Sequence, residues 1–304
     1  MVKEHSGYDR RRFLTRFLIQ AGAISFFRYP AIASHLLQST SDVTLRFIVG
    51  SDTHFFQPRR EKENAIQTQA FIDLVNSLNI KTKIDFCVFN GDIISRNDKV
   101  DTSCYNLMVQ ARDKLKQLQM PFYVTRGNHD EISESDWKNV WDISVNDIAT
   151  IRGNEFVFVD TGKYTPGQTT DQIGTPNLEW LKGILDKHRT SDRIFLFLHV
   201  PQHIISSDWG ESENSLFNQL ISNYDNIKAV FLGHEHLNGN AYLFDSVPHF
   251  FDTNIGGLTG DSSGQEIVDE KGFRVVELLR DKTARTYLMS IASHRIHSEF
   301  IFNI

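Results

Sequence analysis

Five short strings of residues along the chain carry side chains that bind metal ions. They combine carboxylates, an amide and several imidazoles, in the order Ser51-Asp52-Thr53-His54, Gly91-Asp92, Gly127-Asn128-His129-Asp130, His199 and Gly233-His234-Glu235-His236. A mixture of carboxylate oxygens and imidazole nitrogens suits zinc, iron or manganese better than calcium or magnesium. The strings therefore predict ligands for two transition-metal ions.

Individual residues within the strings have distinct uses. Asp52 and His54 are two residues apart, so an extended backbone at a strand exit would direct both side chains to one side. Gly91 allows a sharp turn just before Asp92, whose carboxylate can then bridge two cations. Asn128 offers a neutral amide oxygen, which a divalent ion accepts when harder ligands complete its shell.

Each string follows a run of apolar, β-branched or aromatic residues, a composition that favours a strand. The runs are Leu45–Val49, Phe86–Phe89, Phe122–Val124, Ile194–Leu198 and Ala229–Leu232. All five strings are therefore predicted to lie where strands end.

Between these strands the sequence predicts helices, as in a βαβ sheet. The predicted helices are Glu63–Leu78, Cys104–Leu118, Asn177–Lys187, entered through Thr175-Pro176, and Leu216–Tyr224. Glu155–Asp160 is predicted as a further strand, and the tail from Ala241 as strands without a clear helix. The tail strands are Tyr242–Phe244, His249–Asp252, Gly272–Leu279, Arg285–Ser290 and His297–Phe302. Gly256-Gly257 has the composition of a mobile loop.

The order D-x-H, G-D, G-N-H-[DE], H and G-H-x-H resembles the calcineurin-like metallophosphoesterase family, and the match runs from Asp52 to His236. The resemblance implies an α/β fold, a four-layer α/β/β/α sandwich of two mixed β-sheets flanked by helices. It implies one metal held by Asp52, His54, Asp92 and His236, and the other held by Asp92, Asn128, His199 and His234. His129 would be no ligand.

The implied activity is hydrolysis of a phosphomonoester or phosphodiester by a water or hydroxide that bridges two metal ions (manganese, iron or zinc). His129 would protonate the leaving alkoxide or steady the phosphate oxygens, and Asp130 would orient His129. Two alternatives stay open: a nucleotide or cyclic-nucleotide phosphodiesterase, and a catalytically silent binding scaffold of the same fold. A purely structural zinc site would be closed by four ligands, and the strings supply more.

Some residues bear on substrate choice. Arg126 precedes Gly127, as in the R-G-N-H string of protein Ser/Thr phosphatases, and could bind phosphate in a forked geometry. An arginine exposed on the strand edge is an equally weighted alternative. Ser95 stands where purple acid phosphatases carry tyrosine, which argues against that subfamily. His203 is interpreted as a solvated loop residue.

The first 33 residues resemble a twin-arginine export signal. Arg10 and Arg11 precede an apolar run, Phe17–Phe27, and Ala31-Ile32-Ala33 supplies small residues for cleavage. The run of 11 residues is too short to span a membrane, which needs about 20. We therefore expect a leader over residues 1–33 and one phosphoesterase domain over residues 34–304. The expected protein is exported by the twin-arginine machinery to the periplasm or beyond, without a transmembrane anchor.

Charge narrows the class of partner. The leader carries six basic and two acidic residues, so removing its +4 from the net −6 leaves −10 for the remainder. An acidic body argues against strong nucleic-acid binding, whereas a small phosphorylated substrate can bind because metal ions reverse the local field. Cys87 and Cys104 are expected to be free thiols.

Overall fold

The computed structural model describes residues 42–57, 60–95, 104–162, 176–202, 216–236, 241–257 and 271–304. The predicted leader, Thr175 and His203 lie outside these ranges. Within them, none of the helices combines the length and the apolar character needed to cross a membrane.

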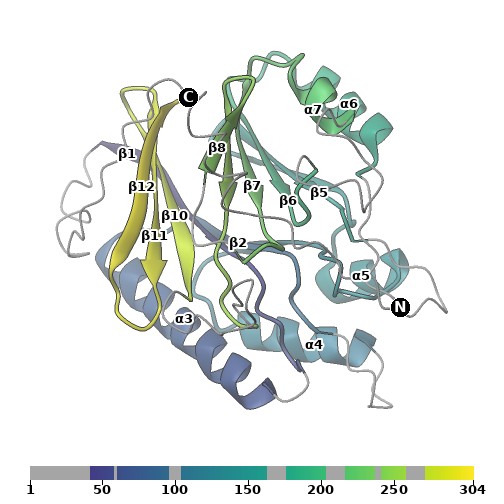
Figure 1. Cartoon of the computed structure of the whole chain (residues 1–304), viewed down its shortest axis with the longest axis vertical. Helices are drawn as coiled ribbons and strands as arrows, with labels where there is room; N and C mark the ends of the chain where they lie inside the picture. Colours follow the sequence, from purple (N-terminus) through teal and green to yellow (C-terminus); the bar gives the residue numbers. More distant parts are fainter. Residues whose placement is uncertain are drawn as a thin grey trace, which may run out of the picture.

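The described strands form two six-stranded mixed sheets that face one another (Figure 1). In the first sheet the order is β12-β11-β10-β1-β2-β3, with β1, β2 and β3 parallel and β10, β11 and β12 antiparallel to their neighbours. Its strands are β1 (Val43–Gly50), β2 (Phe86–Asn90), β3 (Phe122–Thr125), β10 (Gly272–Leu279), β11 (Thr283–Ser290) and β12 (Ile296–Asn303).

The second sheet has the order β4-β5-β6-β7-β9-β8, in which β5, β6, β7 and β9 run parallel and the edge strands β4 and β8 run antiparallel. Its strands are β4 (Asp147–Ile151), β5 (Asn154–Val159), β6 (Ile194–Leu198), β7 (Ile227–Leu232), β8 (Ala241–Phe244) and β9 (Val247–Phe251).

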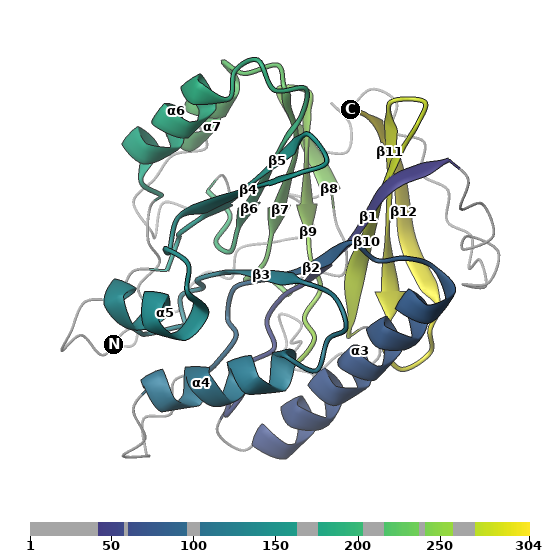
Figure 2. The same ribbon diagram turned by 180° about the vertical axis from the view of Figure 1, so that it is seen from behind.

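Helices cover the outer faces of both sheets. Figure 2 shows α3, α4 and α5 beneath the first sheet and α6 and α7 outside the second. The helices are α3 (Glu61–Lys81), α4 (Cys104–Leu115), α5 (Glu134–Trp141), α6 (Leu178–Lys187) and α7 (Leu216–Ile221). The arrangement confirms the four-layer α/β/β/α sandwich.

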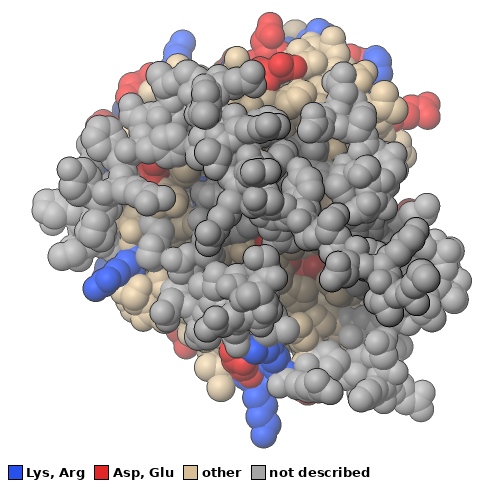
Figure 3. Space-filling model, in the orientation of Figure 1, with Lys and Arg blue, Asp and Glu red and all other residues tan. Residues whose placement is uncertain are grey.

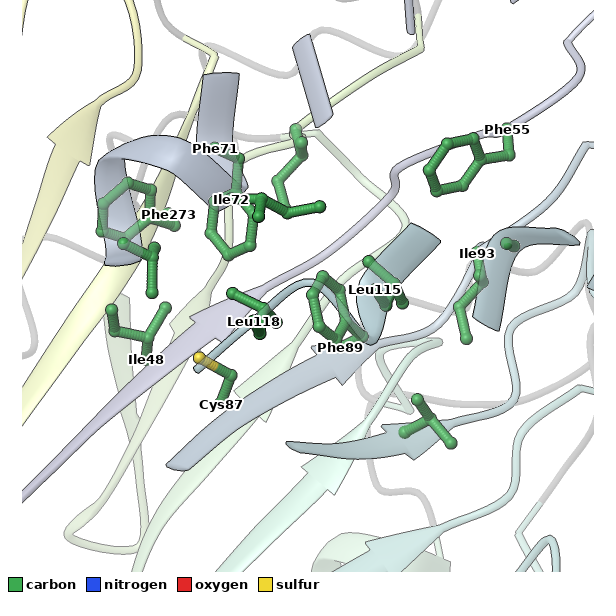
Figure 4. Close-up of a cluster of buried hydrophobic side chains, with 14 of the residues drawn as sticks. Ile48, Phe55, Phe71, Ile72, Cys87, Phe89, Ile93, Leu115, Leu118 and Phe273 are labelled. Atoms are coloured by element: carbon green, nitrogen blue, oxygen red, sulfur yellow. The ribbon is translucent and has the colours of Figure 1, made fainter. Parts of the chain in front are cut away.

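The central strands are apolar on both faces because each sheet lies between two layers. In β1, the Phe47 ring points between the sheets, where it stacks on Phe86 at 5.0 Å and meets Phe156 edge-on at 5.4 Å. The neighbouring Ile48 points the other way and packs with Phe71 of α3 (Figure 4). Strict alternation of this kind fixes the register of β1, since a slip of one residue would exchange the two faces.

Among the described elements, two are not predicted from the sequence: the helix α5 and the strand β4. Ser133 caps α5, its hydroxyl accepting a hydrogen bond from the Asp136 amide at 3.1 Å. Helix α6 begins at Leu178, one residue later than predicted, because Asn177 is its N-cap and its side chain accepts from the Trp180 amide at 3.0 Å. Helices α4 and α7 end three residues before their predicted ends at Leu118 and Tyr224.

Two smaller expectations have clear outcomes. Cys87 and Cys104 are free thiols, as predicted, and burial strongly raises the pKa of Cys87. Gly256 and Gly257 are buried and bonded rather than a mobile loop, because the Gly256 amide donates to the Asp52 carbonyl at 2.9 Å.

Candidate metal centre

The five strings meet at one end of the sandwich. Strands β1, β2 and β3 deliver three of them from the first sheet, and β6 and β7 deliver two from the second. The side-chain amide of Asn90, the last residue of β2, donates to the carbonyl of Leu198, the last residue of β6, at 3.1 Å. The two sheets are therefore bonded to each other directly behind the strings, and the prediction that each string follows a strand is confirmed.

The side chains form two groups of possible metal ligands. The first subsite consists of Asp52, His54 and His236, and the second of Asp92, His199 and His234; within each group the ligand atoms lie within 4.8 Å of one another. In the first subsite the His236 Nε2 atom lies 2.9 Å from Asp52 Oδ1 and 3.2 Å from His54 Nε2.

Asp92 lies between the two subsites. Its Oδ2 atom is 3.1 Å from His199 Nε2 in the second subsite and 3.8 Å from His54 Nε2 in the first. Asn128 joins the second subsite, with its Oδ1 atom 2.9 Å from His234 Nδ1. Asp92 thus faces both groups, which is the arrangement expected of a bridging ligand. Asp52 Oδ1 also lies 3.9 Å from His199 Nε2, but its shortest contact, at 2.9 Å, is with His236 in the first subsite.

The outer nitrogens of two imidazoles are bonded to the protein. The His54 Nδ1 atom lies 2.7 Å from the Ser95 hydroxyl, and the His199 Nδ1 atom donates to the Asn90 carbonyl at 2.7 Å. Such contacts fix the tautomer of a metal-binding histidine and turn the other nitrogen to the metal. His199 Nε2 is buried and faces Asp92 Oδ2 at 3.1 Å. These residues fit a pair of transition-metal ions.

The backbone at the site is strained. Five of the seven predicted metal ligands have positive φ angles: Asp52 at 55°, His54 at 45°, Asp92 at 50°, His234 at 69° and His236 at 47°. Each such conformation costs about 1–3 kcal/mol and persists only where neighbouring contacts enforce it, typically at functional sites. The extended backbone predicted for Asp52 to His54 is wrong, since turns rather than strand alternation aim these side chains.

A glycine is required directly before Asp92. Gly91 has φ of 84°, and a Cβ atom there would lie 2.4 Å from the His199 ring. No larger residue fits between β2 and that imidazole, so Gly91 permits both the turn and the close approach.

The two central carboxylates are held ionised. Burial raises the pKa of Asp52, but the charges of His236 and His199 outweigh it and leave the pKa well below the usual value. Burial likewise raises the pKa of Asp92, and His199 and His129 reverse that shift, so its pKa is lowered. Both groups are therefore in the form that binds metal ions.

The pKa values of the imidazoles are shifted in opposite directions. Burial lowers the pKa of His54, and burial with the charge of His199 lowers the pKa of His234 to about 4. Burial also opposes the charge on His199, but Asp92 and Asp52 raise its pKa to about 10. The field at the centre of the site therefore favours a positive charge, which a bound cation would supply in place of that proton.

His129 lies at the open side of the site. Its Nε2 atom is 4.0 Å from Asp92 Oδ2, its backbone amide donates to Asp92 Oδ1 at 2.8 Å, and its side chain is 31% exposed. The imidazole is thus placed to reach a group bound over the two subsites.

In the described part of the chain, the contacts of the Asp130 carboxylate go to two backbone amides rather than to the His129 ring. One carboxylate oxygen accepts from the Ile94 amide at 3.0 Å and the other from the Gly127 amide at 2.9 Å. Burial and the nearby Asp92 carboxylate raise the pKa of Asp130 to about 7. Its observed contacts tie the loop after β2 to the loop after β3.

Arg126 is neither exposed on a strand edge nor open to a ligand. The residue is 3% exposed, and its guanidinium grips Asp160, with Nε to Oδ1 at 2.9 Å and Nη2 to Oδ2 at 2.5 Å. Its Nη1 atom donates to the Ile132 carbonyl at 2.9 Å. The forked geometry predicted for phosphate is thus directed at a carboxylate of the protein itself.

Sequence reasoning missed the supporting residues. In the sequence Ser95 stands out only as a departure from purple acid phosphatases, yet its hydroxyl contacts His54. Asn64, in the first turn of α3, donates to the His54 carbonyl at 2.8 Å and carries no local signal, since it lies ten residues away.

Known proteins resemble the part of the chain that carries the five strings. Residues 45–238 match the model of the calcineurin-like phosphoesterase family. A protein of Arcobacter nitrofigilis named as a probable glycerophosphodiester phosphodiesterase, GpdQ, is 25% identical over 203 residues, which cover 61% of this chain and 70% of that protein.

Solved structures share the fold. A dimetal phosphatase from Danio rerio superposes with a TM-score of 0.65 at 13% identity, covering 86% of this chain and 99% of that one. A purple acid phosphatase from yellow lupin superposes with a TM-score of 0.61 at 11% identity, covering 85% of this chain and 53% of the lupin chain. The chain belongs to the calcineurin-like phosphoesterase family and is a hydrolase that acts on phosphoester bonds.

Proposed function

We propose that this hydrolase cleaves small phosphodiesters at a two-metal site formed by the first and second subsites. The observation that carries the proposal is the pairing of Arg126 with Asp160, at 2.9 Å and 2.5 Å, beside a site whose Asp92 carboxylate faces both subsites. The ion pair between Arg126 and Asp160 is the argument for a diester substrate. The position of Asp92 is the argument for two metal ions.

A phosphomonoester presents a second negative charge that a phosphodiester lacks. An enzyme specialised for monoesters gains from an extra cation, and Arg126 is the obvious candidate in the sequence. Its fork is occupied by Asp160, and the charges that act most strongly on Asp52 and Asp92 come from imidazoles. A site in which Arg126 is already paired suits a diester, which carries only one negative charge. The name of the Arcobacter relative, a probable glycerophosphodiester phosphodiesterase, supports the same substrate class.

The residues divide the chemistry between them. The two subsites would hold transition-metal ions, which when bound lower the pKa of water and clamp the oxygens of an in-line displacement at phosphorus. Asp92 would fix the spacing of the subsites, and Asn128 would complete the second. His129, at the open side, would hold a proton at Nε2 and give it to the departing alkoxide oxygen.

The test is a paired hydrolysis assay on metal-depleted protein reconstituted with manganese, zinc or iron. The substrates are bis(p-nitrophenyl) phosphate and p-nitrophenyl phosphate, followed by glycerophosphodiesters and cyclic nucleotides. We expect kcat/KM for the diester to exceed that for the monoester by about tenfold or more, because one charged hydrogen bond is worth about 1.5–3 kcal/mol. A preference for the monoester, or turnover of neither substrate, would overturn the proposal.

The described part of one face is consistent with a small-molecule substrate. On the face shown in Figure 3, the Lys and Arg side chains of the described residues are spread among Asp and Glu side chains rather than gathered in one patch. Strong binding to nucleic acid depends on a basic stripe or patch.

The proposed location is outside the cytoplasm, reached through the twin-arginine route. The support is the sequence of residues 1–33, with Arg10 and Arg11 before a short apolar run. Residues 1–33 fused to a reporter should be exported, and a fusion with both arginines changed to lysine should not. Export of the lysine variant would point to the general secretory route.

A further inference from the structure

We propose that Asn64 and Gly257 are positioning residues that hold His54 in place for the first metal subsite. The inference rests on the two-metal site of the proposed function and adds the elements that build one half of it. Neither residue belongs to the five strings.

Asn64 joins two loops through one buried amide. The residue lies in the first turn of α3 and is fully buried. Its Nδ2 atom donates to the His54 carbonyl at 2.8 Å and to Gln57 Oε1 at 3.2 Å, and its Oδ1 atom accepts from the Gly257 amide at 3.1 Å. The side chain thus bonds the loop after β1 to the loop after β9.

The bond to His54 restrains a strained residue. His54 has φ of 45°, a conformation that non-glycine residues adopt only when their surroundings enforce it. Its amide donates to the Asp92 carbonyl at 3.0 Å, and its carbonyl accepts from Asn64 and from the Gln57 amide. Asn64 supplies the shorter of the two bonds to that carbonyl, at 2.8 Å against 3.2 Å.

Gly257 closes the site from the other side. The amides of Ile255 and Gly256 donate to the carbonyls of Ser51 and Asp52, both at 2.9 Å, and the next amide, of Gly257, turns to Asn64. Gly257 has φ of 72°, and a Cβ atom there would lie 2.6 Å from the His54 ring and 3.2 Å from the His236 ring. Only glycine leaves room for both imidazoles of the first subsite.

The support is specific to one subsite. His199 of the second subsite is held instead by the Asn90 carbonyl at 2.7 Å. Loss of Asn64, or a methyl group at Gly257, should therefore weaken metal binding at the first subsite and spare the second. Outer residues that orient metal ligands typically change metal affinity by about 10–100-fold.

The chain offers a matched control for each change. Asn76 lies on the same helix, twelve residues after Asn64, and its amide also donates to a carbonyl (Gln117, 2.9 Å) and accepts from an amide (Gln119, 2.9 Å). Gly153 has φ of 76°, close to that of Gly257, and a Cβ atom added there would meet no other atom within 4 Å. Asn76→Ala therefore removes the same kinds of hydrogen bond, and Gly153→Ala adds the same methyl group at a positive φ, without the contact to His54.

The experiment measures Zn²⁺ binding by calorimetry on metal-depleted full chain in two backgrounds. His234→Ala leaves the first subsite to be read alone, and His236→Ala leaves the second. Asn64→Ala and Gly257→Ala should each weaken Zn²⁺ binding about 10–100-fold in the His234→Ala background and less than threefold in the other. The two controls should change neither affinity, whatever they do to the melting temperature.

Equal weakening in both backgrounds, or none in either, would overturn the positioning role. If the two backgrounds do not each retain one ion, the two-subsite assignment itself fails, and the roles of Asn64 and Gly257 fail with it. Because the measurement reads metal binding, a wrong substrate class in the proposed function would leave its outcome unaffected.

Discussion

Arg126→Met tests whether the structure assigns that arginine correctly. The guanidinium makes three hydrogen bonds, two to Asp160 and one to the Ile132 carbonyl, and the side chains of the ion pair are 4% and 13% exposed. Burial raises the pKa of Asp160, and the Arg126 guanidinium opposes that shift. Removing the arginine leaves a nearly buried carboxylate without its counter-charge.

Breaking a buried pair from one side costs about 3–5 kcal/mol. We therefore expect Arg126→Met to lower the free energy of unfolding by about that amount, measured by urea denaturation. Arg152→Met is the matched control, because Arg152 meets Asp85 at the same 2.5 Å but is 46% exposed. A pair with an exposed partner contributes about 1 kcal/mol or less. Asp85 also keeps Lys83 at 3.4 Å when Arg152 is removed, so the control should lose far less stability than Arg126→Met.

The same variant distinguishes a structural arginine from a phosphate-binding one. With its fork on Asp160, Arg126 should leave kcat/KM of the folded fraction within about tenfold of wild type, or about 1.4 kcal/mol. Changing both partners, as Arg126→Met with Asp160→Leu, should recover part of the lost stability, since no charge is then left unpaired. A loss of activity above about 100-fold with stability within about 1 kcal/mol of wild type would refute this reasoning.

Three further predictions concern the site and the core. Asp92→Asn should lower kcat by more than about 100-fold and reduce the bound metal found by elemental analysis, because it removes the charge that both subsites share; near-normal turnover would contradict a two-metal mechanism. His129→Ala should lower kcat about 10²–10⁴-fold with both metals retained, and more for alkyl than for aryl leaving groups, which need less help from an acid; loss of metal would show that His129 is a ligand. Burial lowers the pKa of His249 from 6.5 to about 4, so the unfolded chain binds its proton first as the pH falls; this should remove up to about 3 kcal/mol of stability between pH 6.5 and pH 4, and urea titrations of metal-depleted protein should show a shallower pH dependence for His249→Phe.

The parts of the fold that could be predicted are those that local sequence dictates. The central strands read as apolar runs because both their faces are covered, and Ile194–Leu198 is predicted with its observed bounds. Edge strand β4 has no such run, since none of its residues is fully buried, and the sequence does not reveal it. The eight-residue helix α5 is too short to give a clear helical period.

The same distinction separates the site residues that the local sequence predicts from those that it does not. Ligands that follow a strand directly could be found from the sequence, because the strand end fixes where they lie. Asp160 lies 34 residues from Arg126, and nothing local to Arg126 indicates that its fork is occupied. Ser95, Asn64 and Gly257 act through contacts between loops, which no local pattern records.

The central claim is that Asp92 lies between two metal ions, one in each subsite. The direct test is anomalous diffraction from crystals of the full chain soaked with Mn²⁺. We predict two peaks about 3.5–4 Å apart, one beside Asp52, His54 and His236 and the other beside His199 and His234. A single peak, or two peaks that Asp92 does not join, would contradict the claim.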